Sequence, residues 1–116
     1  MKAISTIIAI GMLAFFLNTQ AYADDVKFRA EAVGHAEEAV KHGEMGHAKE
    51  LMEHAKESLK YTKMAIEENA DAHMDQAVTE LEEAIKHAEM GHADVATKHT
   101  KEAIQHMHES GVRLIH

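Results

Sequence analysis

The chain has 116 residues, with 12 Lys and Arg against 20 Asp and Glu, 11 histidines, and no cysteine, proline or tryptophan. This length fits one domain. The absence of cysteine excludes disulfides, thiolate zinc sites, iron–sulfur clusters and cysteine nucleophiles. The acidic balance argues against nucleic acid as a partner, because phosphate binding needs a basic surface. Histidine is the outlier of the composition.

The N-terminal segment has the pattern of a secretory signal peptide. Lys2 gives a positive start, an apolar run covers residues 7–17, and Ala21 and Ala23 place small residues where a signal peptidase cuts. An uncleaved membrane anchor is the alternative, but the run is shorter than the ~20 residues that a span needs. We therefore expect residues 1–23 to be a signal peptide cleaved after Ala23. Residues 24–116 would form one domain, exported to a bacterial periplasm and free of the membrane.

An internal repeat organises the rest of the chain. Residues 37–47 recur as residues 82–92, with nine of the 11 positions identical at an offset of 45 residues. The match continues through His54 and His99 and the residues that follow them. Chance does not produce such a match, so the chain contains a duplicated unit.

Each unit has the composition of two helices joined by a short turn. Ala, Glu, Lys, Leu and Met dominate, and no proline interrupts them. In the first helix Val26, Val33 and Val40 repeat every seven residues, and neighbouring alanines widen this apolar stripe. Gly43 and Gly46 lie where that helix must end, in the place of a left-handed turn.

The predicted helices cover residues 25–43, 47–69, 71–89 and 92–110, with Asp71 as the N-cap of the third. Short connections force neighbouring helices to run antiparallel. We therefore predict an all-α fold, an up-down-up-down antiparallel four-helix bundle built from a duplicated helical hairpin. One long coiled coil is the alternative, but the glycines at the centres of the repeats argue against it.

The histidines occur at mirrored positions. When each unit is folded about its glycine turn, the residue numbers of opposed positions have a constant sum. Four histidine pairs then face each other across the hairpins: His42 with His47, His35 with His54, His87 with His92, and His73 with His106. The same rule pairs Glu80 with His99 and Phe28 with Tyr61. We call these six facing pairs the histidine ladder.

Successive pairs of the ladder lie seven residues apart along a helix, or about 10.5 Å. Two pairs at this distance cannot share one ion, so we expect each pair to be a separate site. Helical geometry places the pairs beside the packed seam, where water and ions reach them. His108 and His116 lie outside the ladder, and we assign them no site.

Carboxylates lie one helical turn from most of the ladder histidines, on the same face. They can be direct oxygen ligands or can orient the imidazoles. The candidate metal ligands are therefore the nine ladder histidines with Glu80, Glu31, Glu38, Glu50, Glu57, Glu83 and Glu102. Glu109 also follows His106 by three residues. Mixed imidazole and carboxylate sites suit Cu(II), Ni(II) and Zn(II), with copper first in the divalent order, whereas calcium and magnesium prefer all-oxygen shells.

Other interpretations stay open. The histidines could be solubilising groups or a pH-responsive surface. The sulfurs of Met45 and Met90, at equivalent turn positions, could hold Cu(I) or simply cap the bundle end. Two Glu-x-x-His strings end at His47 and His92; di-iron carboxylate enzymes use such strings, but project them into a bundle interior rather than from turns. A metal-responsive interaction protein is a further class, although nothing in the sequence marks a protein partner.

Several motifs resemble the small metal-binding protein family. They are the paired Glu-Glu-Ala-(Val/Ile)-Lys-His…Gly-His runs, His-Ala-Lys-Glu-Ser-Leu at residues 54–59 and Val-Ala-Thr-Lys-His at residues 95–99. The resemblance implies a periplasmic, histidine-rich helical repeat protein that binds several divalent metals, chiefly copper. It carries metal binding over to His35, His42, His47, His54, His87, His92 and His99. Phe28, Tyr61 and Glu80 depart from a full histidine ladder, which implies fewer ions than in a more histidine-rich relative.

The sequence thus predicts a metal buffer, scavenger or carrier and not an enzyme, with no catalytic residues. Its partners would be divalent transition-metal ions, Cu(II) preferred and Ni(II) or Zn(II) accepted. Imidazole must be neutral to bind a metal, so we expect ion uptake to fail below about pH 6.

Overall fold

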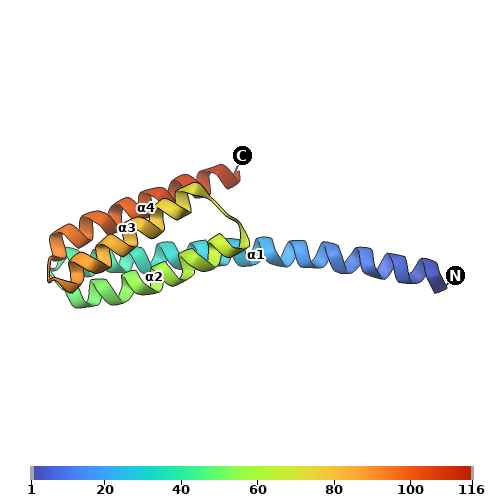
Figure 1. The fold of residues 1–116 in the computed structure, drawn as a ribbon, viewed down its shortest axis with the longest axis horizontal. Helices are drawn as coiled ribbons and strands as arrows, with labels where there is room; N and C mark the ends of the chain where they lie inside the picture. The colour runs from blue at the N-terminus through green and yellow to red at the C-terminus, as the bar shows by residue number, and fades with distance from the viewer. Residues whose placement is uncertain (1, 116) are drawn as a thin grey trace.

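The computed structural model describes the backbone of residues 2–115 and the side chains of residues 23–110. Four helices follow one another: α1 (Lys2–Glu44), α2 (Ala48–Glu68), α3 (Ala72–Glu89) and α4 (Ala93–Ile115). No strand occurs within residues 2–115. Figure 1 shows the helices side by side in a bundle, with the first half of α1 extending beyond the other three. The predicted all-α fold is confirmed.

The helices form a square in chain order. α1 packs against α2 and α4, and α3 packs against the same two helices. Contacts between α1 and α4 run antiparallel, since Arg29 reaches Ser110 while Glu44 reaches Lys101. The α1–α2 and α3–α4 turns share one end of the bundle, which we call the turn end, and the α2–α3 link lies at the other, the connector end (Figure 1). This is the up-down-up-down arrangement.

Two helices are longer than expected. α1 begins at Lys2 rather than near residue 25, and α4 continues to Ile115 rather than ending at residue 110. The reason lies in the chain itself, because no proline breaks the run from the apolar segment into the first repeat. The signal-peptide prediction falls largely on side chains outside the described residues, as does His116. Within the part of the chain whose side chains are described, no helix is both long and apolar enough to cross a bilayer.

Of the local signals predicted from the sequence, the left-handed glycines and the Asp71 cap are confirmed, and the role of Gly43 differs. Gly46 (φ 78°) and Gly91 (φ 77°) end the first helix of each hairpin in the left-handed conformation. Gly43, also expected to serve the turn, instead lies in α1, where a Cβ would come within 2.0 Å of Thr97 Oγ1 and 2.5 Å of Leu51 Cδ1. It is therefore a close-packing residue between helices. Asp71 caps α3 as predicted, accepting from the backbone N–H groups of His73 (2.8 Å) and Met74 (3.3 Å).

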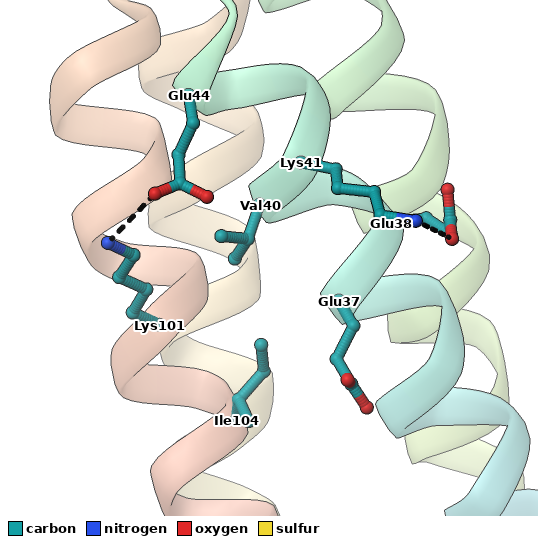
Figure 2. Close-up of a pocket in the computed structure, with 7 residues that line it drawn as sticks. All are labelled: Glu37, Glu38, Val40, Lys41, Glu44, Lys101 and Ile104. Atoms are coloured by element: carbon teal, nitrogen blue, oxygen red, sulfur yellow. Dashed lines mark hydrogen bonds and ion pairs between the residues drawn. The ribbon is translucent and has the colours of Figure 1, made fainter.

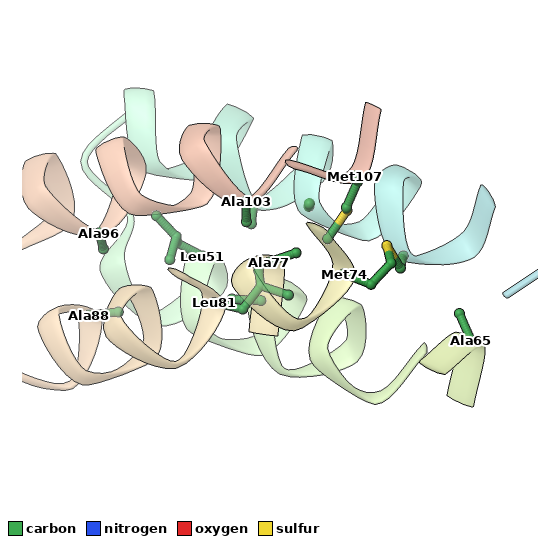
Figure 3. Close-up of a cluster of buried hydrophobic side chains, with 13 residues drawn as sticks. Leu51, Ala65, Met74, Ala77, Leu81, Ala88, Ala96, Ala103 and Met107 are labelled. Carbon is green, nitrogen blue, oxygen red and sulfur yellow. The ribbon is translucent and has the colours of Figure 1, made fainter. Parts of the chain in front are cut away.

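The core is built mainly from alanine. Ala32, Ala36 and Ala39 of α1 are fully buried, whereas Val26 is exposed and Val33 and Val40 are half-buried. The valine stripe expected at the centre of the seam therefore lies at its edge. Larger side chains fill the space between helices, chiefly Leu51, Leu81, Met74 and Met107 (Figure 3). Small residues let the helices approach closely, and this brings side chains at the seam edges into contact.

Buried hydroxyls reinforce this close packing. Ser58 donates to the carbonyl of Ala32 across the α1–α2 seam at 2.7 Å. Thr62 and Thr100, both fully buried, each donate to a carbonyl four residues earlier, at 2.8 Å. Since each hydroxyl has an acceptor, its burial does not leave an unpaired polar group.

A buried polar cluster closes the connector end, and no pattern in the sequence indicates it. The Arg29 guanidinium donates to Asp25, at 2.9 Å, and to the Ser110 hydroxyl. Burial raises the pKa of Asp71, but hydrogen bonds from the His73 and Met74 N–H groups and from Ser110, with the Arg29 charge, lower it overall. The cluster therefore links α1, α4 and the start of α3 around one guanidinium.

Candidate metal centre

All six facing pairs of the ladder are in contact. The ring centroids lie 6.1 Å apart in His35–His54, His42–His47 and His87–His92, and 6.0 Å apart in His73–His106. The Phe28 and Tyr61 rings are 6.4 Å apart. Glu80 Oε2 lies 2.7 Å from His99 Nδ1. The mirrored numbering predicted this pairing, and the structure confirms it.

The pairs are not isolated from one another. His54 lies closer to His42 of the next pair, at 5.2 Å between centroids, than to its own partner His35. His87 and His99 are likewise stacked at 5.4 Å, and His35 stacks on Tyr61 at 5.6 Å. The expectation of well-separated pairs considered only the distance along one helix. Because the two helices are staggered, Tyr61, His54 and His99 each contact a ring of the next pair toward the turn end.

The duplication gives two ladders of matching positions. The first ladder joins α1 and α2, and the second joins α3 and α4. In order from the connector end, the first is Phe28, Tyr61, His35, His54, His42, His47, and the second is His73, His106, Glu80, His99, His87, His92. Since the hairpins form opposite edges of the square, the ladders line opposite sides of the bundle.

Seven of the nine ladder imidazoles are half-buried rather than sealed in the core. Their side chains are between 24% and 29% exposed at His35, His73, His87, His99 and His106. His47 and His92, at the turn end, are exposed. The Nδ1 atoms of His42, His87 and His106 are buried without a hydrogen-bond partner among the described residues. A bound cation would give such an orphaned nitrogen a partner.

The second ladder gathers its ligands into groups. Three sets of imidazole and carboxylate atoms lie within 4.8 Å of one another: His73, His106 and Glu109; Glu80, His99 and Glu102; and Glu83, His87 and His99. Two ligands bound to one ion at about 2.0–2.2 Å each lie up to about 4.4 Å apart. Small side-chain shifts would therefore bring each group onto a transition-metal ion. Among the described residues, the first ladder forms no group of this kind.

Glu109 completes the group nearest the connector end. Its Oε2 lies 3.0 Å from His73 Nδ1, outside hydrogen-bond geometry, and 3.8 Å from His106 Nδ1. Gln105 donates to the other carboxylate oxygen at 3.2 Å. Its spacing from His106 marked it in the sequence, but its approach to His73 on the facing helix depends on how α3 and α4 are packed.

Glu80 is held ionised beside His99. Burial raises the pKa of Glu80, but hydrogen bonds with His99 and Glu102 and the nearby His106 lower it below the ordinary value. This position corresponds to His35 in the first ladder. The second ladder therefore exchanges one imidazole for a charged oxygen ligand at its centre.

The other predicted carboxylates divide into three kinds. Glu31 and Glu83 lie one turn from His35 and His87, at 3.7 and 3.9 Å. Glu38 instead pairs with Lys41 at 3.4 Å. Glu50 and Glu57 are exposed and join none of the ligand groups in the described part of the chain.

Residues outside the ladder have other surroundings. His108 is exposed on α4. The Glu-x-x-His strings lie at the turn end with exposed His47 and His92, not in the alanine-rich interior that a di-iron centre would occupy.

The groove between α1 and α4 is lined by Glu37, Glu38, Val40, Lys41, Glu44, Lys101 and Ile104 and by no histidine (Figure 2). A matching groove lies between α2 and α3, so ladders and grooves alternate around the bundle.

Comparison with known proteins agrees with this geometry. None of the curated proteins compared with the chain matches it. A family model described as "Small metal-binding protein" matches residues 1–110, which include every ladder residue. With that match, and with the imidazole and carboxylate groups able to hold a metal, we conclude that the chain belongs to the small metal-binding protein family.

Proposed function

We propose that the protein is an exported buffer, scavenger or carrier that binds several divalent transition-metal ions along its two ladders. Cu(II) is the preferred ion, and Ni(II) and Zn(II) also bind. The observation that carries the proposal is the second ladder, where three groups of imidazole and carboxylate atoms already lie within 4.8 Å. Nitrogen and oxygen donors of this kind suit these ions, and copper leads the affinity order at such sites.

The partial exposure of the ladders supports a buffering role. An ion can reach a half-buried imidazole from solvent without unfolding of the bundle. Because adjacent pairs are in contact, an ion leaving one pair meets the next ligand within the same ladder. The formal charge of −8 adds a diffuse attraction for cations. Open sites that keep water among their ligands favour modest affinity and ready exchange over permanent retention.

Export to the periplasm is part of the same proposal. It rests on the N-terminal pattern, with Lys2, the apolar run at residues 7–17 and the small residues before Asp24. Metal capture outside the cytoplasm also suits a chain that carries no cysteine, because imidazole and carboxylate ligands are not lost to oxidation.

Native mass spectrometry with Zn(II), Ni(II) and Cu(II) tests the proposal by counting bound ions. We expect more than one ion per chain, and one fewer when both His73 and His106 are replaced by alanine. His108→Ala is the matched control, because this exposed histidine of the same helix lies outside the ladder. If the control lost as many ions as His73→Ala/His106→Ala, binding would be non-specific and the proposal would fail.

A further inference from the structure

Two methionines at the turn end are not accounted for by packing. Met45 and Met90 are 58% and 51% exposed, more than any other large hydrophobic residue among the described side chains. In contrast, Met74 and Met107 are buried in the core, and Met52 packs against it. An apolar side chain in water forgoes the gain from burial. These two methionines therefore do not form the apolar cap of the bundle end that was the alternative interpretation of the sequence.

The duplicated turn holds the backbone of each methionine between two histidines. In the first turn, the backbone N–H groups of Met45 and His47 both donate to the carbonyl of His42, at 3.2 and 2.9 Å. In the second, Met90 and His92 donate to the carbonyl of His87 at 3.1 and 2.9 Å. The ring centroids of each histidine pair are 6.1 Å apart. Each tight turn thus presents one thioether and two imidazoles within six residues.

The turn end also differs from the rest of the ladders in its carboxylates. Glu44, which precedes Met45, pairs with Lys101 of α4 at 3.6 Å (Figure 2). His47 and His92 belong to none of the carboxylate-containing groups. Thioether sulfur is a soft donor that favours Cu(I), whereas carboxylate oxygens favour harder divalent ions. In the second ladder the donor set therefore changes from nitrogen with oxygen toward nitrogen with sulfur at His92 and Met90.

We propose that each turn is a binding site for a soft monovalent ion, Cu(I) or Ag(I), with Met45, His42 and His47 as ligands in the first hairpin and Met90, His87 and His92 in the second. This inference rests on the proposed function only because the turn sites use some of the same imidazoles as the proposed divalent sites. Binding adds no redox step, since the ion arrives already monovalent. The protein then takes copper in both oxidation states, at different places on the same ladders.

Ag(I) is the probe of choice, because it is redox-inert and diamagnetic. In the full chain with ¹³C-labelled methionine methyl groups, we expect silver nitrate to shift the resonances of Met45 and Met90 first. The variant Met45→Leu/Met90→Leu keeps the side-chain volume nearly constant and should weaken Ag(I) binding by about tenfold or more. Its Zn(II) binding should stay within about twofold of the unmodified protein, because zinc does not need the thioether.

Met64→Leu is the matched control. Met64 is a half-buried methionine of α2, away from both turns, and its replacement should leave Ag(I) binding unchanged. The proposal is overturned if the Met64 methyl shifts as early as those of the turns, or if Met45→Leu/Met90→Leu binds Ag(I) like the unmodified chain. If the unmodified chain did not bind Zn(II), the proposed function as a buffer of divalent ions would fail. The Ag(I) measurements would still test the turn sites independently.

Discussion

The two hairpins share a backbone plan but offer metals different surroundings. Positions 45 residues apart correspond throughout, so Phe28, Tyr61 and Met64 of the first hairpin match His73, His106 and Glu109 of the second. Phe28 and Tyr61 make an aromatic contact, whereas the second set makes a group of two imidazoles and a carboxylate. The two hairpins thus differ at three matched positions of the connector end. The first hairpin uses these positions for packing, and the second uses them for possible metal ligands.

The same contrast continues at the centre of the ladders. His35 of the first hairpin stacks against Tyr61 with an interplanar angle of 4°. Its counterpart Glu80 pairs with His99 and approaches Glu102. The first ladder is therefore largely a stack of rings, whereas the second is a set of rings already associated with carboxylates. Since preorganised ligands bind more tightly than those that must be rearranged, the second hairpin should fill first.

The largest effect is expected when matched histidine pairs are removed from the two hairpins. We expect His87→Ala/His99→Ala to weaken binding of the first Zn(II) by about 10–100-fold, because it dismantles two ligand groups. The matched variant His42→Ala/His54→Ala removes the corresponding stacked pair and should change the first affinity by less than about threefold. Isothermal titration calorimetry measures both, and equal losses would show that the hairpins are equivalent.

A second test transfers the connector-end group of ligands from the second hairpin to the first. The triple variant Phe28→His/Tyr61→His/Met64→Glu gives the first hairpin the residues of the His73–His106–Glu109 group. We expect one additional ion per chain by native mass spectrometry, with a loss of about 1 kcal/mol of stability from the aromatic contact. The reverse variant, His73→Phe/His106→Tyr/Glu109→Met, should bind one ion fewer. An unchanged ion count in both variants would refute the role assigned to this group.

Packing at the turn end also differs between the hairpins. Gly43→Ala should destabilise the protein by about 1–3 kcal/mol, because the new methyl group meets Thr97 and Leu51. The counterpart Ala88→Gly lowers helix propensity, by about 1 kcal/mol, and removes one buried methyl group, but it introduces no clash. Urea unfolding followed by circular dichroism gives both values. A Gly43→Ala protein as stable as the unmodified one would mean that α1 and α4 are less closely packed than described.

The smallest effect is expected at Glu80, which has no carboxylate counterpart in the first ladder. Its pKa lies below the ordinary value of 4.5 in the folded protein, so its ionised form adds stability above that pH. This contribution is lost as the pH falls through the folded-state pKa. Glu80→Gln should cost about 1 kcal/mol near pH 5, and the cost should shrink toward pH 3.

Glu82→Gln, at an exposed position of the same helix, is the control for Glu80→Gln. It should show no such dependence on pH when both variants are compared with the unmodified protein by thermal unfolding. A cost of Glu80→Gln that stayed constant from pH 5 to pH 3 would contradict the pairing with His99.

The repeat made much of this site predictable from sequence. A fixed offset and a constant sum of residue numbers determine which positions face each other, and neither requires knowledge of helix packing. The diagonal contacts, such as His42 with His54, depend on the stagger between two helices. That stagger is set by the buried alanines and by the Ser58 hydrogen bond to Ala32, which the periodicity of the valines does not reveal.

Other features depend on contacts between distant parts of the chain. Gly43 looks like a turn residue in the sequence, and only the approach of Thr97 from α4 identifies its packing role. The cluster of Arg29, Asp25 and Ser110 joins residues 81 positions apart. Neither has a local signal, because no pattern within one helix encodes the identity of its neighbour.

The most direct test of the central claim is a Zn(II) titration followed through the ring nitrogens of the histidines by ¹H–¹⁵N NMR of the full chain. If facing imidazoles bind ions together, both members of a pair such as His73 and His106 should shift at the same zinc concentration, while His108 stays unchanged. Ring nitrogens of His73 and His106 that respond at unrelated concentrations, or together with His108, would contradict the ladder as a set of metal sites.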